Sequence, residues 1–339
     1  MQPFIQDYST TKQFTYSIIL PLSNDLCYFV KWLESLLSQS HQGSTEILFI
    51  DNSFDHSIRP HLEKIIQRYF LHLEKKDYTF YYIHHPQKLK YYDSLNTTLQ
   101  LVNGEWIYIS GQNISLEEKT FSRFDQAIQT CTNLDLICGR FYQINTEAEI
   151  VKTSPLLGLE GLVNQDFFSF FLFNNPLESA PILYNKKIFE LLGYFNSQLE
   201  QFIDWEFLRR ITQSSCTTWY YYPKYLACSC SDSAEKDVLN PPNYSSQSIW
   251  KMINLGQQYY PHREQKLVKK SQYIKLFTFI NQLFLDAKVD QTFSLLWEIV
   301  QYSELGDRLW LEVLNQSKLK YKREIYDVIV MFSRTLSPC

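Results

Sequence analysis

The sequence is poor in glycine, and this scarcity bears on which phosphate-binding loops it can form. Only 9 of its 339 residues are Gly. The first predicted strand, residues 16–20, runs into Pro-Leu-Ser-Asn at residues 21–24, which contains no Gly. The dinucleotide-binding fingerprint and the Walker loop both need Gly where the backbone approaches a phosphate. The pattern therefore counts strongly against both classes of nucleotide site.

Paired cysteines and long apolar runs are also missing. The 7 Cys show no CxxC spacing, and Cys228 and Cys230 lie too close together for a zinc knuckle. The most apolar stretch, residues 167–173, is far below the ~20 residues that span a bilayer. Residues 1–15 lack the basic and then apolar pattern of a signal peptide. We expect a soluble, cytoplasmic protein with reduced thiols and no transmembrane segment.

Positive charge is not in excess either. The net charge is −4 and the pI is about 6.0, so we expect no nucleic-acid partner. What the sequence has in abundance is aromatic residues, with 24 Tyr, 24 Phe and 7 Trp. We interpret most of them as a buried core, and platforms for sugars or bases are the alternative.

Strand and helix patterns alternate along the first 110 residues. Strand-like residues 16–20, 46–50, 79–83 and 106–109 are separated by helix-like residues 26–38, 60–70 and 91–102. This order predicts a mostly parallel sheet that is covered on both faces. Further helices are expected at 121–130, 186–192 and 203–212, strands at 134–142, 181–184 and 217–222, and irregular aromatic residues at 150–180.

The C-terminal third has a different character. Residues 229–248 contain Asn-Pro-Pro-Asn and are typical of a linker or surface loop. Beyond them, apolar residues such as Tyr273, Phe277 and Ile280 recur at helical spacing. We expect one domain at residues 1–230, and a linker with a C-terminal α-helical appendage at residues 231–339. The appendage carries no cluster of side chains that indicates a catalytic site. We therefore expect it to have a packing role or to bind a protein partner.

Four segments follow one another in an order known from one family. They are residues 17–24 (SIILPLSN), 46–55 (EILFIDNSFD), 94–107 (SLNTTLQLVNGEWI) and 188–210, which contains GYFN and then IDWEFLRR. With these segments the chain resembles a family 2 glycosyltransferase from about residue 16 to 222. The resemblance implies the type A nucleotide-sugar-binding fold, with a Rossmann-like α/β sheet that is mixed but mostly parallel. It also implies transfer from a nucleotide-sugar donor, most simply of UDP type, to a glycan, lipid-linked or protein acceptor in glycoconjugate biosynthesis.

The resemblance also implies which residues bind the donor. Pro21 and Asn24 would edge the nucleotide pocket, and Asp51 and Asn52 would read the base, where the family often has paired acids. An Asn can serve there because its amide both donates and accepts hydrogen bonds. The alternative for Asp51 is a cap on the loop that follows it.

Asp204 falls on the catalytic base of the resembling family. An inverting sugar transfer needs a carboxylate that takes the proton of the acceptor hydroxyl as this oxygen attacks the sugar. Ile203 stands where the family has Glu, and we expect the apolar neighbour to leave Asp204 in a drier place, which would raise its pKa. A helix cap is the alternative role for Asp204.

The chain departs from the family at the metal-binding acids. These should lie at Ser110 and Gln112, and Asn113 follows. Mn²⁺ and Mg²⁺ prefer hard oxygens and usually one or two carboxylates, whereas these side chains are neutral. We therefore expect poor metal affinity and name no metal ligand, although the family implies Mn or Mg. Ser110 and Gln112 stay candidates for contact with the donor.

Three interpretations of this departure stay open. In the first, the protein is a transferase that stabilises the leaving diphosphate without metal, through a basic side chain such as Lys88, Lys90 or Arg140. In the second it is a non-catalytic binding or scaffolding subunit, and in the third the metal-binding acids lie elsewhere in the chain. His84 and His85 follow a predicted strand and could contact a metal ion. Neighbouring residues of a strand point to opposite faces, however, which counts against a site that uses both side chains.

Overall fold

The computed structural model describes residues 5–8, 12–22, 26–41, 43–52, 58–73, 75–85, 89–163, 171, 175–199, 203–214, 217–230 and 309–336, with isolated positions between 270 and 296. The chain divides into two compact units. The first holds Met1–Phe170, Asn175–Ser197 and Ser214–Ala234, and the second holds Phe171–Asn174, Gln198–Gln213 and Glu235–Cys339. The expected domain boundary at residue 230 stays a prediction.

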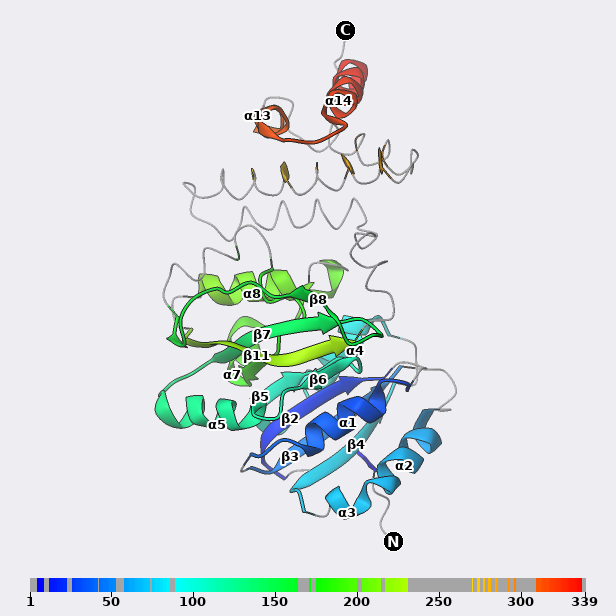
Figure 1. Ribbon diagram of the computed structural model, residues 1–339, viewed down its shortest axis with the longest axis vertical. Helices are drawn as coiled ribbons and strands as arrows, with labels where there is room; N and C mark the ends of the chain where they lie inside the picture. The colour runs from blue at the N-terminus through cyan, green and yellow to red at the C-terminus, as the bar shows by residue number, and fades with distance from the viewer. Residues whose placement is uncertain are drawn as a thin grey trace. The chain divides into compact units, whose positions relative to one another are not determined.

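An 11-stranded mixed sheet forms the centre of the first unit (Figure 1). Its strand order is β1-β4-β3-β2-β5-β10-β7-β11-β6, with β8 beside β7 and β9 beside β11. The strands are β1 Ile5–Asp7, β2 Phe14–Pro21, β3 Thr45–Asp51, β4 Tyr78–His84, β5 Gly104–Ile109, β6 Ile114–Leu116, β7 Leu136–Ile144, β8 Ile150–Thr153, β9 Gly161–Leu162, β10 Ile182–Asn185 and β11 Trp219–Cys230.

The strand directions bring several predicted site residues to one edge of the sheet. Strands β1, β4, β3, β2 and β5 are parallel neighbours, whereas β10 runs antiparallel to both β5 and β7. Pro21 lies opposite Ile50, Asp51 lies opposite His84, and the backbone N–H of Ser110 donates to Ile19. The carboxyl ends of β4, β3, β2 and β5 therefore meet at the same edge.

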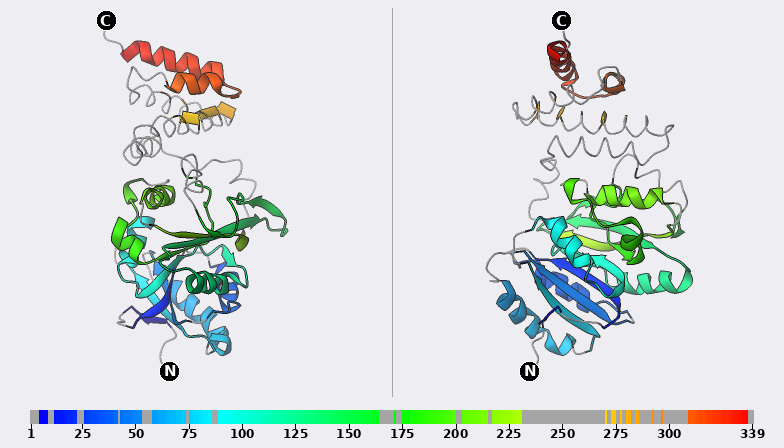
Figure 2. Two further views of the ribbon diagram at one scale, coloured as in Figure 1. Left: turned by 90° about the vertical axis from the view of Figure 1, so that its left-hand side faces the viewer. Right: turned by 180° about the vertical axis from the view of Figure 1, so that it is seen from behind.

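Helices cover the sheet. Figure 1 shows α1 in front of the sheet, and the reverse view of Figure 2 shows α4 on the other side. One core joins α1, α2 and α5 to alternate residues of the strands, and it contains Phe29, Trp32, Phe49, Phe80, Tyr82, Tyr108, Phe121 and Phe124. The helices are α1 Phe29–Leu37, α2 Ile58–Arg68, α3 Phe70–Leu73, α4 Tyr91–Leu99, α5 Thr120–Thr130 and α7 Lys187–Leu192, with a 3-10 turn at Ser197–Leu199.

The predicted fold class is confirmed, and the differences lie in the short strands. The sheet is mixed and mostly parallel, and helices follow it. Residues 150–180, expected to be irregular, contain β8 and β9, and β1 and β6 were not expected. Strand β11 continues to Cys230, so the expected linker would begin inside a strand. Strands of two to four residues are too short to show an alternating pattern.

Gly104 has a different role from the one expected. The sequence predicts a helix over 91–102 with Asn103 and Gly104 as its stop, but α4 ends at Leu99 and Gly104 begins β5. A Cβ at Gly104 would lie 2.4 Å from Ser17 Oγ and 2.5 Å from the Ser17 backbone N. Glycine is therefore needed there for the close approach of β5 to β2.

The second unit is helical in the part that the structure describes. It contains α8 Ile203–Gln213, α13 Leu309–Gln316 and α14 Lys322–Leu336, and α13 packs against α14. Lys270 Nζ contacts Glu312 at 3.0 Å. Residues 231–248, most of the expected linker, lie outside the described residues. Among the described residues, no helix is long and apolar enough to cross a membrane.

Candidate functional site

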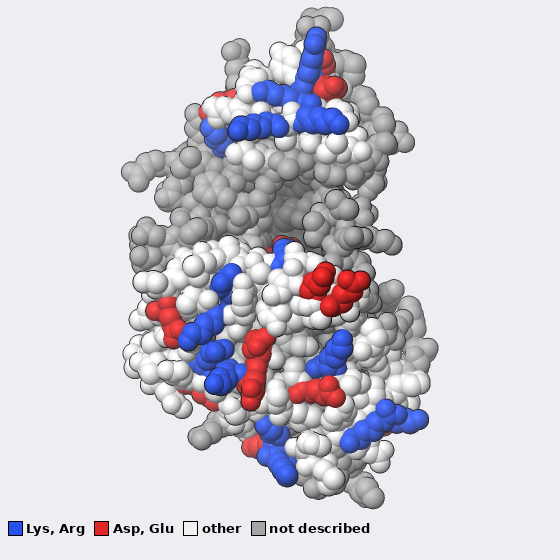
Figure 3. All heavy atoms as spheres, in the orientation of Figure 1, with Lys and Arg blue, Asp and Glu red and all other residues white. Residues whose placement is uncertain are grey.

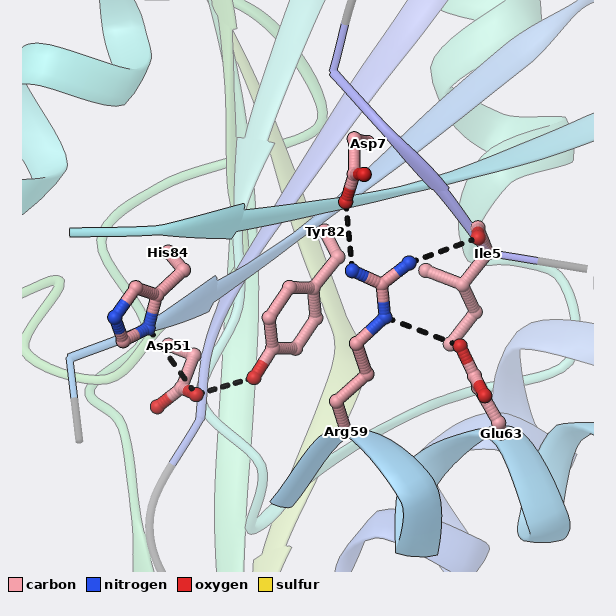
Figure 4. Close-up of polar contacts among 7 residues, drawn as sticks. All are labelled: Ile5, Asp7, Asp51, Arg59, Glu63, Tyr82 and His84. Atoms are coloured by element: carbon pink, nitrogen blue, oxygen red, sulfur yellow. Dashed lines mark hydrogen bonds and ion pairs between the residues drawn. The ribbon is translucent and has the colours of Figure 1, made fainter. Parts of the chain in front are cut away.

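The Asp51 carboxylate lies at the end of β3 and is fully buried. The Tyr82 hydroxyl donates a hydrogen bond to Asp51 Oδ2, and His84 Nδ1 lies 3.6 Å from the same oxygen (Figure 4). Burial and the hydrogen bond to Asp51 both raise the pKa of Tyr82. The phenol therefore keeps its proton and acts as a donor to the carboxylate.

Arg59 of α2 lies against the other side of Tyr82 (Figure 4). Its Cζ is 5.0 Å from the centre of the Tyr82 ring. Its Nη1 contacts Asp7 at 2.6 Å, its Nε contacts Glu63 at 3.1 Å, and its Nη2 donates to the Ile5 carbonyl at 3.4 Å. The guanidinium thus ties β1 and α2 to the side chain that holds Asp51.

Asn52 points its carboxamide at the chain that follows β4. Its Nδ2 donates to the carbonyl of Leu89, and the backbone N–H of Leu89 donates to Asn52 Oδ1 at 3.0 Å. Leu89 directly precedes Lys90, the N-cap residue of α4. In this structure the amide holds the start of α4, and the predicted contact of Asn52 with a base stays a prediction.

Ser110 is buried at the end of β5 and is bonded to α1. Trp32 Nε1 donates to Ser110 Oγ at 2.9 Å, and Ser110 Oγ lies 3.2 Å from the carbonyl oxygen of Gly111. The first place of the expected acid pair is thus a hydroxyl that accepts an indole N–H. The side chain fastens α1 to the sheet edge.

The side chains present do not fit a divalent metal. Gln112, at the second place, is a neutral amide that is 9% exposed. Among the described residues, no group of three or more His, Cys, Asp or Glu is placed to hold a metal ion. Since Mn²⁺ and Mg²⁺ sites beside phosphates are usually built on carboxylates, this donor set is wrong for the metal that the family implies.

The structure describes only some of the remaining predicted residues. Pro21 ends β2 beside Asp51, whereas Asn24 and Lys88 lie outside the described residues. Arg140 donates to the Ser154 carbonyl at 2.8 Å, and its Cζ lies 4.4 Å from the centre of the Tyr225 ring. On the face drawn in Figure 3, basic and acidic side chains are interspersed over the described surface.

Asp204 belongs to the second unit. It is the second residue of α8 and is exposed, while its neighbour Ile203 is buried. The dry environment expected from Ile203 is therefore not found in this structure. The reason is helical geometry, because consecutive residues of a helix point in different directions.

Sequence reasoning missed the side chains that hold the site, namely Trp32, Arg59 and Tyr82. A signal existed for Tyr82, which lies two residues before His84 and so shares its face of the strand. Nothing in the sequence gives the register that sets this face beside Asp51.

The first half of the chain matches a known family. Residues 17–173 match the model described as Glycosyl transferase family 2. The resemblance on the strand-end motifs is thereby confirmed. A comparison of the chain with curated proteins finds no match.

Solved structures share the fold of this chain. The structure of TarS residues 1–349 from S. aureus is 15% identical, with a TM-score of 0.61, and the match covers 95% of this chain and 90% of that one. The same TarS segment in complex with UDP-GlcNAc is 14% identical, with a TM-score of 0.63, and the match covers 95% and 91%. Identities this low show the fold alone, which is that of type A glycosyltransferases.

Proposed function

We propose that the chain is an inverting glycosyltransferase that uses a nucleotide-sugar donor of UDP type and a glycan, lipid-linked or protein acceptor. The observation that carries this proposal is the match of residues 17–173 to the model described as Glycosyl transferase family 2, in which Asp51 ends β3. The complexes of TarS with UDP and with UDP-GlcNAc support a donor of this type.

In this proposal each site residue has one task. Asp51 accepts the N–H of the base, and Pro21 lies at the edge of the base pocket. Asp204 takes the proton of the acceptor hydroxyl, for which an exposed carboxylate is accessible. Without carboxylates at positions 110 and 112, transfer proceeds without a divalent metal. The C-terminal helices bind a protein partner.

Calorimetry with UDP, in EDTA and in Mn²⁺, tests the donor and the metal together. We expect UDP to bind with the same affinity in both buffers. With UDP-GlcNAc as one donor of this class, Asp204→Asn should abolish the enzymatic release of UDP. The same variant should bind UDP with unchanged affinity. Asp327→Asn is the matched control, because Asp327 is also an exposed helical acid of the second unit. Binding that requires Mn²⁺ contradicts the metal-free mechanism.

A second function, a non-catalytic binding or scaffolding subunit, is favoured by a different observation. Asn52 and Ser110 are both engaged by partners within the chain, Leu89 and Trp32. Such contacts serve the stability of the sheet edge whether or not a donor binds. The absence of UDP binding in the same calorimetry would leave this function and contradict the enzyme.

A further inference from the structure

Four basic residues lie close together where α13 ends and α14 begins. Lys318, Lys320, Lys322 and Arg323 fall within residues 317–323, which contain no acidic residue although the chain has a net charge of −4. We propose that this basic turn (residues 317–323) binds the surface of a membrane that contains anionic lipids. The proposal goes beyond the proposed function, because it needs neither the donor nor the acceptor of a transfer reaction.

Contacts within the second unit hold the basic turn in shape. The backbone N–H of Tyr321 donates to Asn281 Oδ1 at 2.9 Å, and the Tyr321 ring stacks on Phe284 with 5.3 Å between the ring centres. Lys322 Nζ donates to the carbonyl of Asn315, in the last turn of α13. The turn is therefore tied both to α13 and to the segment around Phe284, and its exposed side chains extend from a fixed backbone.

Helix stability accounts for only one of the four charges. Lys322 complements the negative end of α13, whereas Arg323 lies in the first turn of α14, where a helix favours acidic side chains. Arg323 Nε lies 4.0 Å from Asp327, and an ion pair between two exposed side chains contributes little. Lys318 and Lys320 are exposed, and neither takes part in an ion pair among the described residues.

The surroundings of these charges favour a membrane over a nucleic acid. Leu319 lies half-buried between two exposed lysines, and Tyr326, three residues after Arg323 on the surface of α14, is 40% exposed. Basic clusters attract anionic lipid headgroups, and Tyr is enriched at the headgroup level of membranes. Nucleic acids are bound instead along a basic stripe or groove, usually of a basic domain.

The distribution of charge makes the basic turn distinct from the rest of the described surface. Figure 3 shows basic side chains gathered on the described C-terminal segment, whereas basic and acidic side chains alternate over the first unit. An anionic membrane repels an acidic chain as a whole and attracts it at this turn. We therefore expect reversible binding that weakens as salt screens the charges.

Sedimentation of the full chain with lipid vesicles tests the proposal. One set of vesicles contains phosphatidylcholine with phosphatidylglycerol, and the other contains phosphatidylcholine alone. We expect the chain to bind the first set at low salt, to lose most of this binding at high salt, and to leave the second set unbound. Equal binding to both sets, or no binding to either, contradicts the proposal.

Charge removal in the basic turn tests whether the turn is the site. Lys318→Gln with Lys320→Gln should lower the partition coefficient about 25-fold, because each basic residue near an anionic surface contributes about fivefold. Lys318→Arg with Lys320→Arg keeps the charges and should keep the binding. The matched control is Lys64→Gln with Lys75→Gln, which removes two exposed lysines of the first unit and should change the binding by less than about twofold.

The remaining outcomes each decide the matter. Thermal unfolding checks that every variant is folded, and the salt dependence of the wild type needs no variant at all. Equal losses in the two Gln double variants would mean that overall charge binds the vesicles and that the basic turn does not. If a single-stranded oligonucleotide binds through Lys318 and Lys320 while the anionic vesicles do not bind, the turn is a nucleic-acid site and the membrane proposal is wrong.

Discussion

The Asn52 side chain forms hydrogen bonds with both backbone groups of Leu89, as a residue of a neighbouring strand would. Its amide donates to one backbone group and accepts from the other. An ionised Asp has no N–H to donate, so only the amide can make both bonds. The resembling family often has a second acid here, and this chain has a structural reason for Asn.

We predict that Asn52→Asp destabilises the first unit although the two side chains have the same shape. The variant loses a donor and sets a carboxylate oxygen against the Leu89 carbonyl, which should cost about 1–3 kcal/mol. Urea denaturation measures the loss. Gln126→Glu makes the same chemical change at an exposed helix position and should change stability little. Equal stability of the two variants would contradict a stabilising role for the two hydrogen bonds between Asn52 and the Leu89 backbone.

At the scale of single residues, the sequence predicts where a residue lies along a strand better than it predicts which side chain that residue contacts. That Asp51 and Ser110 end strands follows from apolar runs that close in polar residues. Their partners Tyr82 and Trp32 depend on the register of β4 against β3 and on the rotation of α1. These are properties of packing between distant segments, and no local pattern encodes them.

Among the elements, β5 approaches β2 closely at Gly104. We predict that Gly104→Ala costs about 1–3 kcal/mol, because the new methyl group meets backbone as well as the Ser17 side chain. Chemical denaturation measures the cost. Gly158→Ala is the control, because a Cβ there meets nothing within 4 Å. A Gly104→Ala protein as stable as this control would mean that β5 can shift.

Long elements could be predicted and short ones could not. Helices such as α1 and α5 show two or more turns of apolar spacing, and β3 is a continuous buried run. Strands β8 and β9 exist because β7 and β11 supply hydrogen-bonding partners. The same tertiary pairing extends β11 beyond its predicted end.

For the molecule as a whole, a buried acid lies at the opposite end of the strands. Glu46 is the second residue of β3, and its Oε1 accepts from Ser17 Oγ at 2.5 Å and from the backbone N–H groups of Asn103 and Gly104 at 2.6 and 3.2 Å. Burial raises the pKa of Glu46, and these hydrogen bonds offset the effect only in part.

This raised pKa predicts the sign of a pH effect on stability. Between the ordinary pKa of Glu and the higher folded value, the folded state binds more protons, so stability falls as pH rises through this window. Glu46→Gln keeps the accepting oxygen and should remove the fall. Urea midpoints at about pH 4 and about pH 8 measure it, with the exposed Glu118→Gln as control. An unchanged pH profile in Glu46→Gln would contradict this assignment.

The hydrogen bond from Trp32 to Ser110 bears on any attempt to redesign this protein for metal dependence. Ser110→Asp with Gln112→Asp would change only the segment that follows β5, while Trp32 Nε1 of α1 lies 2.9 Å from the Ser110 Oγ that the first substitution replaces. The acids and the helix that covers them form one unit of design, and a third change at Trp32 is needed to make room for an ion.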